Sequence, residues 1–240
     1  MKFEKTDVWG FEHAIRGARN PLESWGRSDS WQSDFTEDGK NGFVIGNNDM
    51  NLLQRLIKAS IKEGNSHSKF LRQIMVSVDI TAPMYWWSEF DTYKVGTVAN
   101  STSKMHKLAT TPITLKCFET DDINMNLQGT NYYGARNWSV GEMASWIIDG
   151  LEHLRQRYLE TKDKRYWKEL VRWIPESWLQ TRTVTLNYQV LRQMYFDRRN
   201  HKLNEWSGKD DPDNENFVKW VKTLPYSEEL IMYEGNSSNG

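Results

Sequence analysis

The strongest constraint on the fold is the alternating segment at residues 73–80, "QIMVSVDI". A strand points successive side chains to opposite faces of a sheet, so a half-buried strand alternates apolar and polar residues. One face of this segment carries Ile74, Val76, Val78 and Ile80, and the other carries Met75, Ser77 and Asp79. The segment is therefore predicted to be a half-buried strand that ends at Pro83.

Helical spacing marks the flanking regions. A helix is predicted from Asn48 to Gly64, because apolar residues recur every three to four positions before a glycine that can end the helix. In the second half, Ser139 and Glu142 form a capping box ahead of an apolar series. A further helix is predicted from Asp163 to about Pro175, and a loop follows it. Two more helices are predicted at 187–198 and at 217–224. The helix at 187–198 has Asn187, Leu191, Met194 and Arg198 along one stripe.

The remaining segments carry little periodicity. Residues 1–46 are rich in Trp, Gly, Ser and Asp, which predicts loops with no more than one short strand. The stretch "GKDDPDNEN" is predicted to be a solvated loop. Residues 1–234 are expected to form a single domain, and residues 235–240 a flexible tail.

Composition narrows the class of protein. A chain of 240 residues with 38% hydrophobic residues can bury a substantial core. Its 31 basic and 32 acidic residues nearly cancel, which disfavours a long nucleic-acid partner. The sequence shows no membrane-length apolar run and no signal peptide, so a cytoplasmic protein is expected. The single Cys117 excludes an internal disulfide and is interpreted as a small apolar residue.

Standard catalytic signatures are absent. The sequence contains no phosphate-binding glycine loop after a strand, no His-Glu-x-x-His and no nucleophile elbow. The five histidines have no spacing that would place a pair on one helical face, so no metal site is predicted.

The order of the elements resembles the flavin-dependent thymidylate synthase family. The stretch "GNSHSKFLRQIMVSVDITAPMYWWSEF" is similar to that family's passage from a Gly-His turn through a strand to Ala-Pro and a Phe-ended helix. The stretch "IPESWLQTRTVTLNYQVLRQMYFDRRNHKLNEW" resembles its Leu-Pro segment and Asn-bearing helix, closed by an arginine. Together the matches cover most of residues 48–108 and 170–206. The resemblance implies an α/β (α+β) fold with a small central sheet surrounded by helices.

One family motif is replaced. Where the family has Arg-His-Arg, which holds the flavin, this chain has Asp91-Thr92-Tyr93. The replacement removes charge-assisted hydrogen bonds of about 1.5–3 kcal/mol each and adds a carboxylate, which puts the binding of a flavin pyrophosphate in question.

The resemblance implies roles for the positions that match. Arg198 and Ser101 would be catalytic residues, with Arg198 polarising a pyrimidine ring. Substrate contacts would come from Ser101, Ser103, Arg172 and Arg198. Cofactor contacts would come from His67, Asn187, Gln193 and His201, of which His201 is displaced by one position from the family pattern.

Each of these residues also has a plain structural alternative. Arg198 would equally suit the negative end of a helix. Ser101 is typical of a turn, and Asn187 of a satisfied interior amide. His67 would suit a turn, and the aromatic run Tyr85-Trp86-Trp87 would suit the core.

The implied function is methylation at C5 of deoxyuridylate or a related transfer, in a homotetramer that binds a pyrimidine deoxynucleotide. The family uses FAD, NADPH and methylenetetrahydrofolate, and such cofactors carry the hard chemistry while protein groups orient the substrate. One alternative is a non-catalytic descendant that serves as a nucleotide-binding or assembly module. Another is single-stranded nucleic-acid binding through the 12 Trp and 10 Tyr, which the near-zero net charge disfavours.

Overall fold

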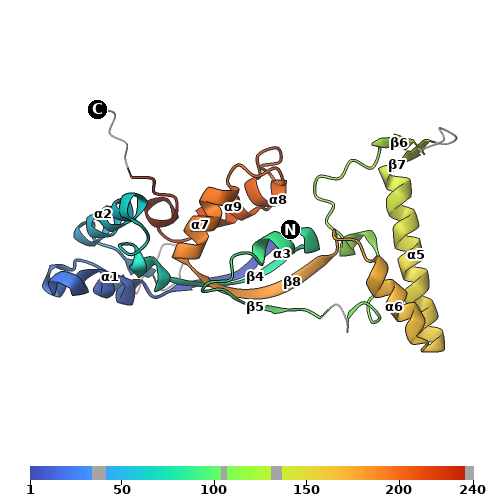
Figure 1. Cartoon of the computed structure of the whole chain (residues 1–240), viewed down its shortest axis with the longest axis horizontal. Coiled ribbons are helices and arrows are strands. Elements are labelled where there is room, and N and C mark those ends of the chain that lie inside the picture. Colours follow the sequence, from blue (N-terminus) through green and yellow to red (C-terminus); the bar gives the residue numbers. More distant parts are fainter. Residues whose placement is uncertain (34–41, 104–106, 131–136, 236–240) are drawn as a thin grey trace. The chain divides into compact units, whose positions relative to one another are not determined.

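The computed structural model describes residues 1–33, 42–103, 107–130 and 137–235. Its largest sheet has four strands in the order β1-β4-β8-β5 (Figure 1). These strands are β1 (Lys2–Trp9), β4 (Met75–Pro83), β5 (Val98–Ser101) and β8 (Leu179–Asn187). Two short antiparallel pairs are formed by β2 (Trp31–Ser33) with β3 (Gly42–Val44), and by β6 (Gln128–Thr130) with β7 (Asn137–Ser139).

Strand β4 confirms the alternation predicted from the sequence. Its buried face includes Val76, Val78 and Ile80, each no more than 1% exposed, and the strand ends at Pro83. Side chains on the other face of β4 form hydrogen bonds to side chains of β8. In the bonded pairs the residue number rises along β4 while it falls along β8, so the two strands are antiparallel. The bonded pairs are Ser77 with Thr185, Asp79 with Thr183, and Thr81 with Thr181.

Strand β8 occupies a segment that was predicted to be a loop. Its apolar residues are few, with Val184 and Leu186 buried near one end. The remaining signal was a run of threonines at every second position, a residue type that favours strands. Because those threonines bond to polar groups of β4, the strand forms without the continuous apolar face that periodicity detects.

The prediction for residues 1–46 is wrong, because this region contains β1, helix α1 (Phe11–Arg19) and the β2–β3 pair. Strand β1 is an edge strand with mostly exposed residues, so it lacks an apolar face. Charged side chains on an edge strand discourage pairing with another chain. Lys5 within it has a φ of 52°, a left-handed conformation that also breaks the regular pattern.

The predicted helices are present. Helix α2 (Asn47–Glu63) ends at Gly64, and α5 (Val140–Thr161) begins with the expected capping box. The others are α3 (Met84–Phe90), α6 (Lys164–Trp173), α7 (Tyr188–Arg198), α8 (Asn204–Ser207) and α9 (Phe217–Lys222), followed by a π-helical turn at Ser227–Ile231. Short 3₁₀ turns lie at Asn20–Leu22, Trp25–Arg27, Lys69–Arg72 and Leu115–Cys117.

Contacts between residues divide the chain into two compact units. The first unit comprises Met1–Lys2, Ile80–Thr92 and Asn100–Arg182, and the second comprises Phe3–Asp79, Tyr93–Ala99 and Thr183–Gly240. The single domain over residues 1–234 stays a prediction, and all of the predicted tail except Gly235 lies outside the described residues. Within those residues, no helix is both long and apolar enough to cross a bilayer.

In the first unit, α5 and α6 lie side by side (Figure 1) and share an apolar cluster. The cluster contains Leu108, Ile113, Phe118, Leu151, Leu170 and Trp178, with Cys117 against it, as expected of a small apolar residue. Trp86 and Trp87 of α3 are fully buried, which confirms the core interpretation of these two rings. The core of the second unit combines aliphatic side chains, such as Leu53 and Ile57, with the fully buried rings of Tyr188, Trp206 and Phe217.

Candidate functional site

The predicted cofactor residue Asn187 lies at the start of α7, in the second unit. Its side-chain Oδ1 accepts the backbone N–H of Val190 at 3.1 Å, and the residue is 6% exposed. Gly96 lies directly against its amide, because a Cβ built on this glycine would lie 2.7 Å from Asn187 Nδ2. Gly96 also has a φ of 78°, so glycine suits the position on both counts. Asn187 is thus a buried, satisfied helix cap that holds residues 93–99 close to α7.

Arg198 lies at the other end of α7, between two aromatic rings. Its guanidinium carbon is 5.6 Å from the ring centroid of Tyr93 and 5.0 Å from that of Trp206. Its Nε donates a hydrogen bond to the Tyr93 hydroxyl at 3.0 Å. These cation–π contacts and the hydrogen bond restrict the guanidinium, and lysine lacks the planar group that makes them. Arg198 lies at a helix end, as the structural alternative has it, but it also contacts Tyr93 and Trp206.

Tyr93 is a neutral link between Arg198 and Asp197. Its hydroxyl donates to Asp197 Oδ2 at 3.2 Å while it accepts from Arg198. Burial raises the pKa of the phenol above its usual value of 10, and outweighs the opposite effect of the nearby Arg198. The hydroxyl thus keeps its proton at neutral pH and can make both bonds.

His201 follows α7 and belongs to a group at the end of this helix that we call the α7 cluster, which consists of Tyr93, Arg198, His201 and Trp206. Asn187 lies at the opposite end of α7. The His201 Nδ1 accepts the backbone N–H of Leu203 at 3.2 Å, and its ring meets Trp206 edge to face at 6.3 Å. The structure thus collects three of the predicted residues, Asn187, Arg198 and His201, along one helix and the turn after it.

Two other predicted cofactor residues lie outside this cluster. Gln193 is exposed on α7. His67 is exposed in the turn after α2, where its Nε2 lies 3.0 Å from Glu63, in line with the turn alternative. Its neighbour Ser68 donates to Gln189 of α7 at 2.9 Å, which ties this turn to the helix. The cofactor roles of both residues stay predictions.

Ser101 and Ser103 lie in the first unit, on the wall of a cavity of about 290 Å³. The segment is held to β8 by the backbone N–H of Thr102, which donates to Thr181 O at 2.9 Å. Gln180 Nε2 in turn donates to Thr102 O at 2.8 Å. The cavity is completed by Leu108, Val171 and Ile174, so hydroxyls and an amide face apolar side chains.

Arg172 does not line this cavity, although its neighbour Val171 does. Its exposed guanidinium donates to Glu169 on the same helix. Ser101 and Arg172 belong to the first unit and Arg198 to the second, so a nucleotide site that joins them stays a prediction.

Asp91 of the replaced family motif has a partner that sequence reasoning missed. Arg182 Nη1 donates to its carboxylate at 2.8 Å, and Arg182 Nε donates to Gln180. The guanidinium carbon of Arg182 also lies 4.2 Å from the ring centroid of the buried Trp87. Arg182 is therefore stacked and paired within the first unit. No short-range pattern links positions 91 and 182, so only the threonine alternation of β8 could have placed it.

The chain has no match among family models or curated proteins, but it resembles solved structures. Thymidylate synthase X (ThyX) from Helicobacter pylori with FAD and dUMP aligns with a TM-score of 0.63 and 16% identity, over 96% of this chain and 97% of that one. A second complex of the flavin-dependent ThyX from Helicobacter pylori with FAD and dUMP gives 0.60 and 17%, over 98% of each chain.

A third similar structure is the UMP/dUMP methylase PolB from Streptomyces cacaoi, bound with 5-Br UMP. It aligns with a TM-score of 0.56 and 15% identity, over 98% of this chain and 94% of that one. The sheet and helices described above define a mixed α/β protein with a small antiparallel sheet. Its fold is that of the flavin-dependent thymidylate synthases, which confirms the fold inferred from the sequence.

Proposed function

We propose that this chain binds a pyrimidine deoxynucleotide, with Arg198 polarising the ring, and acts at C5 of the pyrimidine by methylation of dUMP or a related transfer. The observation that carries the proposal is the stacked position of Arg198 between Tyr93 and Trp206. The proposal is also supported by solved structures of similar fold that contain dUMP or 5-Br UMP.

The chemical role of Arg198 follows from the charge that develops at the ring. Making C5 nucleophilic builds negative charge on a pyrimidine carbonyl oxygen, and fixed N–H donors stabilise such charge. The guanidinium of Arg198 contacts two rings, and its Nε donates to Tyr93, so it is held in place before the ligand arrives. Ser101 and Ser103 offer hydroxyls to the cavity of the first unit, and their implied roles as substrate contacts stay predictions.

The residues at positions 91–93 do not fit a flavin pyrophosphate in the way that Arg-His-Arg would. Asp91 brings a carboxylate that is already paired with Arg182, and Tyr93 brings a phenol bonded to Arg198. A chain that retained the family reaction would need FAD, NADPH and methylenetetrahydrofolate. The proposed roles of this chain's own residues are accordingly binding and ring polarisation.

These same contacts favour a second candidate function, a non-catalytic descendant that keeps the fold as a nucleotide-binding or assembly module. The absorbance spectrum of the purified protein separates the two candidates. Yellow absorbance with flavin released on denaturation supports the enzyme. A colourless protein that cannot rescue a thymidine-requiring host supports the module.

Titration calorimetry with dUMP tests the nucleotide proposal. Wild type is expected to show saturable binding, and Arg198→Ala to lose at least tenfold in affinity. Arg199→Ala is the matched control, because this neighbouring guanidinium pairs with Glu234 instead of stacking on Trp206. Its affinity for dUMP is expected to stay within twofold of wild type. Absence of saturable dUMP binding to wild type contradicts the proposal.

A further inference from the structure

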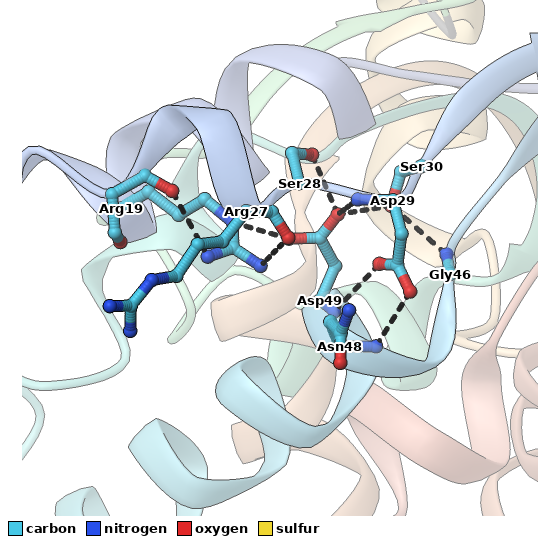
Figure 2. Close-up of polar contacts among 9 residues, drawn as sticks. Arg19, Arg27, Ser28, Asp29, Ser30, Gly46, Asn48 and Asp49 are labelled. Carbon is cyan, nitrogen blue, oxygen red and sulfur yellow. Dashed lines mark hydrogen bonds and ion pairs between the residues drawn. The ribbon is translucent and has the colours of Figure 1, made fainter.

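A buried carboxylate organises residues 24–30 in the second unit (Figure 2). Asp49 of α2 is fully buried, and its Oδ1 accepts from Arg19 Nε at 2.6 Å. Its Oδ2 accepts from the hydroxyls of Ser28 and Ser30 at 2.7 and 2.6 Å, and from the backbone N–H of Asp29 at 3.1 Å. These bonds outweigh the effect of burial and lower the pKa of Asp49. The loop at residues 28–30 is therefore bonded to a carboxylate that stays ionised at neutral pH.

A second carboxylate fixes the loop to the start of α2. Asp29 accepts the backbone N–H groups of Asn48 and Asp49 at 2.9 and 3.1 Å (Figure 2). The contact is so close at Gly46 that a Cβ there would lie 2.2 Å from Asp29 Cγ. Both acidic groups of this region are thus directed inward and satisfied within the fold.

Arg19 is also committed to the fold. Besides Asp49, its guanidinium donates to the carbonyl oxygens of Ser24 at 3.2 Å and Arg27 at 3.1 Å. These bonds fix the backbone of residue 27, so the loop presents the Arg27 side chain from a rigid base. Such pre-organisation by surrounding hydrogen bonds is what a binding site requires.

The organised loop and α2 enclose a cavity of about 560 Å³, which we call the α2 cavity. The polar residues that matter on its wall are Arg19, Arg27, Asp29, Asn48, Asn51 and Arg55. Arg27 and Arg55 are exposed, and neither guanidinium forms a hydrogen bond or ion pair with another residue that the structure describes. Three guanidinium groups line the cavity against one carboxylate, that of Asp29, and the Asp49 carboxylate pairs with Arg19, so the wall keeps a net positive charge.

We propose that the α2 cavity binds the pyrophosphate group of a small anionic ligand. Each guanidinium can donate two parallel hydrogen bonds to a phosphate, so two of them suit a ligand with two phosphate groups. The amides of Asn48 and Asn51 add further donors, and the cavity volume is in the range of ligand sites. This site shares no residue with the proposed pyrimidine nucleotide site, and goes beyond that proposal.

Titration calorimetry of the full chain with sodium pyrophosphate tests the inference. Wild type is expected to bind saturably, and the double variant Arg27→Ala/Arg55→Ala at least tenfold more weakly. Arg72→Ala is the matched control, because Arg72 is an exposed arginine of the same unit that does not line the cavity. Its affinity for pyrophosphate is expected to stay within twofold of wild type.

The outcomes are distinct from those of the nucleotide proposal. Arg198→Ala is expected to bind pyrophosphate as wild type does, even if it loses dUMP. Tighter binding of ADP than of pyrophosphate supports a nucleotide as the source of the group, and equal binding supports the free anion. Absence of saturable binding to wild type, or an equal loss in Arg72→Ala and the double variant, overturns the proposal. Circular dichroism checks that every variant is folded.

Discussion

The hydroxyl of Tyr93 can be removed without removing its ring, which separates the hydrogen bond to Arg198 from the stacking. Tyr93→Phe is expected to lower the free energy of unfolding by about 1 kcal/mol, the net contribution of one such bond. Urea denaturation measures the change. Tyr158→Phe is the control, because the Tyr158 hydroxyl forms no hydrogen bond with another residue that the structure describes. An equal loss in both variants would show that the Tyr93 bond contributes nothing specific.

Residue identities could be predicted better than their partners. The sequence pointed to Asn187, Arg198 and His201, and the structure places all three along α7. It also showed a carboxylate at position 91, but Arg182 lies far along the chain and no local pattern connects the two. The sequence gives no sign of the contact between Trp206 and Arg198, because this contact depends on how the chain folds back after α7.

At the scale of elements, Glu152 of α5 holds the loop at residues 109–113. Its carboxylate accepts from Arg155 at 2.6 and 2.7 Å and from the backbone N–H of Ile113 at 2.8 Å. Arg155 itself donates to Ala109 O at 3.1 Å. The hydrogen bond from Arg155 is the main cause that lowers the pKa of Glu152 from 4.5 to about 2.

The sign of the resulting pH dependence follows from linkage. A carboxyl with a lowered folded pKa stabilises the protein above its unfolded pKa near 4.5, and this stabilisation is lost as pH falls towards 2. Allowing for solvent screening of a partly exposed pair, we expect Glu152→Gln to cost about 1 to 2 kcal/mol at pH 7. The cost should shrink as pH falls below 4.5.

Urea unfolding from pH 7 to 3 measures this effect. Glu160→Gln is the control, since its pair with Arg157 lies on the same helix but is exposed. A Glu152→Gln deficit that is independent of pH would argue against the assignment.

Element prediction succeeded where one face is apolar and failed where it is not. Helix α2 and strand β4 have regular apolar faces and were predicted within a few residues. Strands β1 and β8 form through edge pairing and threonine contacts, which depend on neighbours distant in sequence. Periodicity carries no information about such neighbours.

At the scale of the whole molecule, the family resemblance leads to the proposal of a cytoplasmic homotetramer. Light scattering coupled to size exclusion is expected to give about four times the 28.3 kDa mass of the chain, as closed symmetric assembly predicts. A monomer at micromolar concentration would contradict this proposal. The fold class could be predicted from the order of elements, whereas assembly depends on surfaces that no single segment specifies.

The pairing of Asp91 with Arg182 opposes an arginine at position 91. Restoring an arginine at position 91 alone would set two guanidinium groups against each other beside Trp87, where the present chain has an attraction. A variant with Arg-His-Arg at positions 91–93 would therefore need position 182 to change as well, so its design should start from β8.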